Sequence, residues 1–256
     1  MKFEPTELAE VIRVVPTIHR DARGYFVETW QSRKFAEGGI EADFVQENCS
    51  FSSKGTLRGI HYQVDRPQGR LVRVVEGAVF DVAVDLRRSS PTFGHWTGEV
   101  LSAENRNQLW VPAGFGHGFL VLSETAGFEY SCTDYYSPEH ERQIRWNDPD
   151  IGIDWPIAND EAPLLSDKDG TAPMLKDAET YPEFDAYLQD SLKIVRKLLF
   201  ETPVDPTASN WRSFKETAAF VWRYRDIGGR FYRILDLVTQ SAYDYLSQWF
   251  ESEEIK

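Results

Sequence analysis

Cysteine, methionine and histidine are scarce in this chain of 256 residues, which has two, two and five of them. Cys49 and Cys132 lie in apolar, strand-like surroundings, so we expect both to be buried, inert thiols. No cysteine spacing is typical of a zinc site. Long apolar runs are also lacking: none approaches the roughly 18 residues of a membrane span. The first residues, MKFEPTELAE, lack the apolar core of a signal peptide, so we expect a cytoplasmic protein.

Basic residues are outnumbered as well. Lysine and arginine total 28 against 41 acidic residues, which gives a net charge of -13. Nucleic-acid binding needs a basic face that neutralises phosphates, so this charge argues against a nucleic-acid partner. A small anionic ligand needs only a few local cations, and the composition does not exclude one.

The first two thirds of the chain consist of short runs rich in Val, Phe, Tyr, Trp and Leu, separated by Gly, Pro, Asn and Ser. Runs such as FVQENCSFS, WTGEVLS, QLWVPAGFGHGFLVLS and FEYSCTDYY predict strands. LVRVV and AVFDVAVDL, joined by Glu76 and Gly77, predict a hairpin. Many strands without intervening helices predict a mainly β sandwich or jelly roll.

The remaining third has a different periodicity. FDAYLQDSLKIVRKLLF, NWRSFKETAAFVWRYRD and FYRILDLVTQSAYDYLSQWF each place apolar residues at spacings of three and four, which predicts helices. We therefore expect a jelly-roll domain over residues 1–176 and a small three-helix C-terminal appendage over residues 177–256. The appendage is rich in aromatic residues. It could pack on itself, on the β domain or on a second subunit, or it could dock a separate protein partner.

Two histidines differ from the others, because each lies in an apolar run beside glycines. They are His61 in GTLRGIHYQ and His117 in VPAGFGHGF. A buried imidazole needs a partner for each ring nitrogen. With Arg58 and Arg70 nearby in the sequence, the two histidines predict a polar cavity inside the β fold.

A metal site is a less favoured interpretation of the same residues. VPAGFGHGF has the Pro-x-Gly-x-x-His spacing of the second motif of cupin-type jelly rolls, whose histidine binds metal in some members. The first motif usually supplies His-x-His and then a carboxylate. Here HYQ has one histidine and a glutamine, so we expect no catalytic metal.

Several long motifs, in order along the chain, resemble the dTDP-4-dehydrorhamnose 3,5-epimerase family from about residue 6 to 176. They are RGYFVETW, FVQENCSFSSKGTLRGIHYQ, GRLVRVVEGAVFDVAVDLRRSSPTFG, VPAGFGHGF, YSCTDYYSPEHE, WNDPDIGIDWP and LSDKD. The resemblance implies a cupin-type jelly roll (double-stranded β-helix), usually a homodimer without a metal or other cofactor. It also implies a reaction, the epimerisation of dTDP-4-dehydro-6-deoxyglucose at carbons 3 and 5 through an enolate, on the way to dTDP-rhamnose. The appendage lies outside the resemblance.

By resemblance, His61 is the base, and histidine titrates in the right range for that role. Asp169 of LSDKD would orient its ring, with Asp167 of the same loop as the alternative. Tyr130 would be the acid on the opposite face of the sugar.

Arg70 stands where the family has a lysine, in QGRLVR. It keeps the positive charge that an enolate needs, but it is larger and essentially never deprotonated. Whether one or both carbons are inverted therefore stays open.

The resemblance also implies a set of substrate-binding residues. Arg23 and Arg58 would contact the diphosphate through charge-assisted hydrogen bonds. The other members would line the nucleotide and sugar positions: Phe26, Glu28, Gln46, Asn48, His117 and Tyr136. The RGYFVE segment would reach in from the neighbouring subunit, which would make the dimer functional.

Two alternatives remain. Arg70 favours an epimerase that inverts one carbon, or one that acts on a related nucleotide-linked 4-keto sugar. A non-catalytic sugar-nucleotide-binding protein with a docking appendage is the second alternative. The joint presence of His61, Asp169 and Tyr130 argues against it.

The roles assigned to Arg58 and His61 in GTLRGIHYQ require a particular backbone conformation. Arg58 and His61 are three positions apart, and in a regular strand such residues point to opposite faces. Both can reach one site only if the strand is irregular between them. Gly59 is the natural place for a bulge, so we predict irregular backbone there.

Overall fold

The structure, a computed structural model, describes residues 1–157 and 161–181. Nearly all of the predicted three-helix appendage lies outside the described residues. Met1–Tyr181 form one unit. Packing continues beyond residue 176, because the Tyr181 hydroxyl donates to the Gln63 carbonyl at 2.6 Å. Within residues 1–157 and 161–181, no helix is long and apolar enough to cross a membrane.

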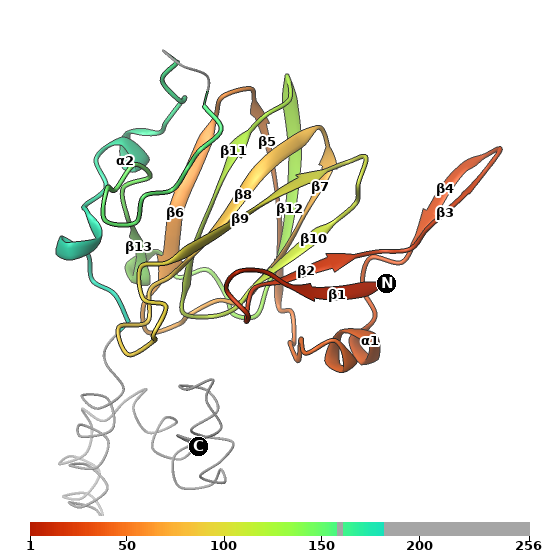
Figure 1. Ribbon diagram of the computed structural model, residues 1–256, viewed down its shortest axis with the longest axis horizontal. Helices are drawn as coiled ribbons and strands as arrows, with labels where there is room; N and C mark the ends of the chain where they lie inside the picture. The colour runs from red at the N-terminus through yellow and green to blue at the C-terminus, as the bar shows by residue number, and fades with distance from the viewer. Residues whose placement is uncertain (158–160, 182–256) are drawn as a thin grey trace, which may run out of the picture. The chain divides into compact units, whose positions relative to one another are not determined.

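Antiparallel strands are the main elements of this unit (Figure 1). In spatial order, the larger sheet contains β1 (Lys2–Pro5), β2 (Ile12–Val15), β10 (Gln108–Val111), β7 (Arg70–Glu76), β12 (Thr125–Cys132) and β5 (Gln46–Ser53). The smaller sheet contains β13 (Glu141–Gln143), β6 (Leu57–Gln63), β11 (Phe115–Val121), β8 (Ala78–Asp85) and β9 (Trp96–Ser102). A separate hairpin contains β3 (Ile18–Asp21) and β4 (Gly24–Val27). The helices are short: α1 (Ser32–Glu37), η1 (Pro138–His140), α2 (Asp167–Gly170) and η2 (Leu175–Asp177).

The chain alternates between the two sheets along most of its length. From β5 to β13 each strand lies in the opposite sheet to the one before it, except that β8 and β9 are neighbours in the smaller sheet. This alternation is the topology of a jelly roll. The predicted mainly β fold is therefore confirmed.

The predicted hairpin between residues 71–75 and 78–86 is wrong. β7 belongs to the larger sheet and β8 to the smaller one, so the chain crosses between sheets at Gly77. Gly77 has φ of +72°, and a Cβ there would lie 2.0 Å from the Thr125 carbonyl oxygen. The glycine therefore serves a tight crossing that looks like a hairpin turn in the sequence.

The main core lies between the sheets. It combines residues of the larger sheet with residues of the smaller one: Val72, Val74 and Phe128 with Val79, Ala83 and Phe119. A second cluster joins other residues of β6 and β8 to the segment after β13. Its members include Ile60, Val82, Ile144, Trp155 and Leu175. This segment therefore packs against the smaller sheet, and it carries α2.

The expectation for the two cysteines is half right. Cys132 is buried, but Cys49 is exposed. β5 is the edge strand of the larger sheet, and its residues alternate between more and less exposed positions. The apolar neighbours of Cys49 in the sequence therefore do not bury it.

Candidate active site

The predicted polar residues come from both sheets. His61 on β6 is paired directly with His117 on β11, so both side chains lie on one face of the smaller sheet. On the larger sheet, Tyr130 lies opposite Asn48 of β5, and Cys132 lies opposite both Gln46 and Arg70. Strand alternation puts this second group on one face too. That face is the inner one, because Val72 and Phe128 of the main core share it.

The backbone of β6 is irregular at Gly59, as predicted. His61 pairs with His117 while Arg58 pairs with Phe119, so the register shifts between them. Gly59 has φ of +125°. As a result Arg58 reaches the facing sheet, where its Nε donates to the Ser52 hydroxyl at 3.1 Å.

His61 contacts a carboxylate that is distant in the sequence. Its Nε2 lies 2.5 Å from Oδ1 of Asp169. Asp169 is buried in α2, whereas Asp167 of the same helix is exposed. The structure thus brings Asp169, and not the alternative Asp167, to His61.

Asp169 remains a carboxylate at neutral pH. Burial by itself would raise its pKa, but the hydrogen bond and charge of His61 outweigh burial and lower it. Hydrogen bonds from the Ser166 hydroxyl and the Gly59 backbone N–H contribute in the same direction. The carboxylate can therefore orient His61 and balance a positive charge on its ring.

Tyr130 faces the site from the other sheet. Burial raises the pKa of its phenol, although the charges of Arg70 and Arg58 oppose the rise. The Arg70 guanidinium carbon lies 6.0 Å from the centre of the Tyr130 ring. The phenol is therefore protonated at neutral pH, and two cations lie near enough to stabilise its anion.

Arg70 is held by two contacts. One terminal nitrogen donates to the His61 carbonyl at 3.3 Å, and the other donates to Oε1 of Gln68 at 3.2 Å. Its Nε is buried and has no partner among the described residues. The two terminal nitrogens therefore fix the guanidinium next to His61.

His117 is paired with a residue that the sequence did not single out. Its Nε2 lies 3.0 Å from both carboxylate oxygens of Asp81, which is fully buried. Burial raises the pKa of Asp81, and the nearby His117 opposes that rise. The pair occupies the inner face beside His61, which fits a role in binding a polar substrate group.

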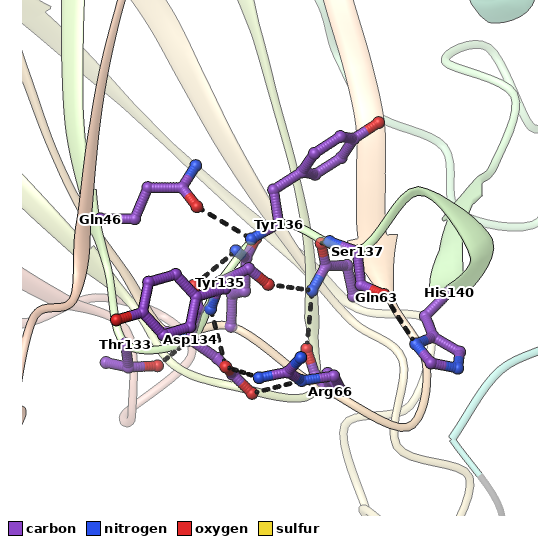
Figure 2. Close-up of polar contacts among 11 residues, drawn as sticks. Gln46, Gln63, Arg66, Thr133, Asp134, Tyr135, Tyr136, Ser137 and His140 are labelled. Carbon is purple, nitrogen blue, oxygen red and sulfur yellow. Dashed lines mark hydrogen bonds and ion pairs between the residues drawn. The ribbon is translucent and has the colours of Figure 1, made fainter.

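The loop after β12 presents Tyr136, and Figure 2 shows how it is fixed. Its backbone N–H donates to Oε1 of Gln46 at 2.9 Å. Gln63, which is fully buried, donates to the Tyr135 carbonyl at 3.3 Å and accepts from the Ser137 N–H at 2.9 Å. Gln63 therefore holds this loop. It is the glutamine of HYQ, at the position where some cupins have a metal ligand.

Sequence reasoning missed two charged residues next to these groups. The Tyr136 hydroxyl donates to Glu141 at 3.0 Å, and Glu141 also forms an ion pair with Lys168. Burial would raise the pKa of Glu141, but its contact with Lys168 lowers it. His61 is near enough to lower the same pKa through its charge. Both residues lie in quoted motifs, YSCTDYYSPEHE and LSDKD, but a charged loop residue is ordinarily solvated and gave no separate signal.

Three predicted binding residues are not brought to this group. Arg23 and Phe26 lie on the β3–β4 hairpin, which extends away from both sheets in Figure 1, and Glu28 follows it. The Arg23 side chain is 90% exposed and pairs with Asp21. Phe26 is 69% exposed, and Glu28 pairs with Lys34. Within residues 1–157 and 161–181, no cluster of three or more metal-ligating side chains is found.

Comparisons with known proteins match nearly the whole described unit. The family model described as dTDP-4-dehydrorhamnose 3,5-epimerase matches residues 5–177. A dTDP-4-dehydrorhamnose 3,5-epimerase of Pseudomonas aeruginosa is 54% identical over 71% of this chain and 100% of its own length.

Two solved structures are informative. The 3,5-epimerase of Legionella pneumophila, in complex with dTDP-4-keto-L-rhamnose, is 48% identical with a TM-score of 0.69, over 72% of this chain and 98% of that one. A 3'-monoepimerase of Streptomyces bikiniensis, in complex with dTDP-quinovose, is 35% identical with a TM-score of 0.65, over 74% of this chain and 96% of that one.

Proposed function

The chain belongs to the dTDP-4-dehydrorhamnose 3,5-epimerase family, and we propose that the residues described above carry out that reaction in this protein. The enzyme is an isomerase with a cupin-type jelly roll. Its substrate is dTDP-4-dehydro-6-deoxyglucose, in which carbons 3 and 5 flank the carbon-4 ketone. The protons on these two carbons are acidic because the ketone accepts the charge as an enolate.

One observation carries the assignment of roles: the base and the acid come from opposite sheets. Asp169 holds one ring nitrogen of His61, so the other nitrogen takes the proton from carbon 3 or carbon 5. Tyr130, on the facing sheet, returns a proton to the opposite side of the same carbon. The configuration is thereby inverted. Water then removes the proton from His61 and reprotonates the Tyr130 phenolate.

Arg70 stabilises the negative charge that develops on the carbon-4 oxygen. Its guanidinium is held by Gln68 and the His61 carbonyl. A preorganised cation of this kind favours the enolate without reorganisation during the reaction. Lys168, paired with Glu141, is a further cation close to the site.

The diphosphate and nucleotide positions rest on the resemblance, and the contacts of Arg58 and Tyr136 support them. Arg58, oriented by Ser52, would bind the diphosphate, and Gln46, Asn48, His117 and Tyr136 would line the sugar and base positions. Arg23, Phe26 and Glu28 would complete the site from the hairpin of a second subunit. The homodimer and the cytoplasmic location stay predictions.

A second candidate function rests on Arg70. Because arginine does not release a proton, an epimerase that needed this group to relay one would invert a single carbon. The relative from Streptomyces bikiniensis is a 3'-monoepimerase on the same fold. A non-catalytic sugar-nucleotide-binding protein would show no proton exchange at all.

One experiment separates these functions. The full-length protein is incubated with dTDP-4-dehydro-6-deoxyglucose in heavy water, and deuterium is located by NMR. Label at carbons 3 and 5 with inversion at both is the expected result. Label and inversion at one carbon would establish a monoepimerase. No exchange on this or a related 4-keto sugar would contradict enzymatic function.

A further inference from the structure

The carboxylate of Asp169 makes separate contacts with its two oxygens. Oδ1 lies 2.5 Å from the His61 ring, and Oδ2 accepts the Ser166 hydroxyl at 2.7 Å. The same hydroxyl oxygen accepts the backbone N–H of Asp169 at 3.2 Å. A serine hydroxyl has one proton, and its lone pair here faces the Asp169 N–H, so the proton is directed to Oδ2.

Local sequence explains this arrangement. Ser166 is the N-cap of α2, and Asp169 is the third residue of that short helix. An N-cap serine ordinarily accepts the backbone N–H of this third residue, which brings its hydroxyl next to the third side chain. The side chain of Asp169 is 4% exposed, so few other donors can reach it.

We propose that Ser166 is a positioning residue for the epimerase reaction, acting as the third member of a His61–Asp169–Ser166 chain. By holding Oδ2, its hydroxyl fixes the rotation of the carboxylate and keeps Oδ1 directed at His61. This role rests on the proposed function of His61 as base. It is separate from capping, in which the hydroxyl serves only as an acceptor.

The charges around Asp169 determine the direction of the expected pH effect. His61 faces it from β6 together with the Gly59 N–H, and Lys168 of α2 lies beside it, paired with Glu141 of β13. Loss of the hydroxyl removes a donor that favours the charged carboxylate. The dyad would then bind a proton more tightly, so the acid limb of the pH–rate profile would move to higher pH.

Three variants of the full-length protein separate donation from capping. Ser166→Ala removes the hydroxyl donor and also a favourable N-cap. Ser166→Gly removes the same donor, but glycine is tolerated at an N-cap nearly as well as serine. Ser166→Thr keeps both. The measurements are kcat and KM for dTDP-4-dehydro-6-deoxyglucose, deuterium incorporation, the pH profile of kcat/KM, and the melting temperature.

We expect Ser166→Ala and Ser166→Gly to lower kcat roughly three- to tenfold with little change in KM, because Asp169 keeps its contacts with His61 and the Gly59 N–H but loses the donor that fixes Oδ2. The acid limb should rise by about half a pH unit in both variants, and Ser166→Thr should match the parent. An active parent with unchanged kcat and pH profile in both variants would overturn the proposal. So would a glycine variant that regains the activity and stability lost with alanine. A parent that exchanges no deuterium would instead overturn the proposed function.

Discussion

Inversion at a carbon needs one group that removes a proton and another that supplies one, in opposite protonation states. At neutral pH the structure holds a charged carboxylate beside the proposed base and a protonated phenol as the proposed acid. Asp169 stays charged beside His61, because the contacts to it lower the pKa of the carboxyl in spite of burial. Tyr130 stays protonated, because burial raises the pKa of its phenol. The two environments therefore suit the proposed roles, His61 with Asp169 as the base and Tyr130 as the acid.

Replacing Tyr130 with phenylalanine tests this separation. In Tyr130→Phe, His61 can still remove the proton, exchange it with solvent and return it to the same face. We expect deuterium incorporation with retained configuration, while inversion falls by roughly 10²- to 10⁴-fold. NMR measures label and configuration together. Tyr135→Phe is the control, since Tyr135 is exposed, and inversion at the parental rate in Tyr130→Phe would rule out Tyr130 as the donor.

The proposed role of Arg70 in stabilising the enolate can be tested by substitution. Arg70→Lys keeps the positive charge near the enolate, so we expect activity equal to or above that of the parent. Arg70→Gln removes the charge and should lower kcat by at least roughly a hundredfold. Steady-state kinetics with both variants measures the difference. A large loss in Arg70→Lys would show that the contacts to Gln68 and the His61 carbonyl have fixed the site around a guanidinium.

The site also depends on how the segment leading to α2 is joined to β6. Leu164 forms a bridge with Thr56, and the Leu57 N–H donates to the Leu164 carbonyl at 3.0 Å. The segment leading to α2 is therefore attached at the start of β6, the strand that carries His61. Two residues far apart in the sequence meet because this attachment sets where Asp169 lies.

Gly59 is the second structural requirement of β6. A Cβ there would lie 2.5 Å from Gly118 Cα and 2.8 Å from the His117 carbonyl oxygen, at φ of +125°. We expect Gly59→Ala to lower the free energy of unfolding by about 2 kcal/mol or more and to displace His61. Urea denaturation and activity measure the two effects.

A matched control isolates the clash. Gly24 has φ of +134° and nothing within 4 Å of the position of a Cβ. Gly24→Ala therefore carries the backbone strain alone, at about 1 kcal/mol. Equal losses of stability in the two variants would mean that close packing against β11 contributes little.

For the strands, the sequence predicted the segments that form them more accurately than the way they pair. Short runs rich in apolar and aromatic residues, bounded by turn residues, identified β9 and β12. The sequence of Glu76 and Gly77 did not distinguish a hairpin from a crossing between sheets, because both need a glycine at positive φ. The bulge at Gly59 was predictable because two functional assignments required it.

Across the whole molecule, resemblance supplied the site residues and the structure supplied their contacts. Asp81, Glu141 and Ser166 were not predicted, because a single polar residue in a strand or loop has no periodic signal. Their roles depend on partners from other parts of the fold: His117 of β11 for Asp81, Lys168 of α2 for Glu141 and, through Asp169, His61 of β6 for Ser166. Contacts of this kind arise from the tertiary fold, and local sequence does not encode them.

The β3–β4 hairpin raises a question about assembly. Arg23 lies at its turn and Phe26 on β4, and both are largely exposed. The hairpin extends away from both sheets (Figure 1). If these residues bind substrate, they do so in the site of another subunit. The active site would then be shared between two copies of the chain.

Complementation between two inactive variants tests a shared site. We expect His61→Asn and Arg23→Ala/Phe26→Ala each to be nearly inactive alone. In a heterodimer of the two, one site combines an intact His61 with the intact hairpin of its partner, and the other site carries both defects. Random mixing places half of the subunits in heterodimers, so about a quarter of the wild-type activity per subunit should return. Unfolding and refolding the two variants together, followed by the deuterium assay, measures this recovery. Refolding each variant alone is the control. Activity no greater than the sum of the separate variants would mean that the hairpin does not serve a partner's site.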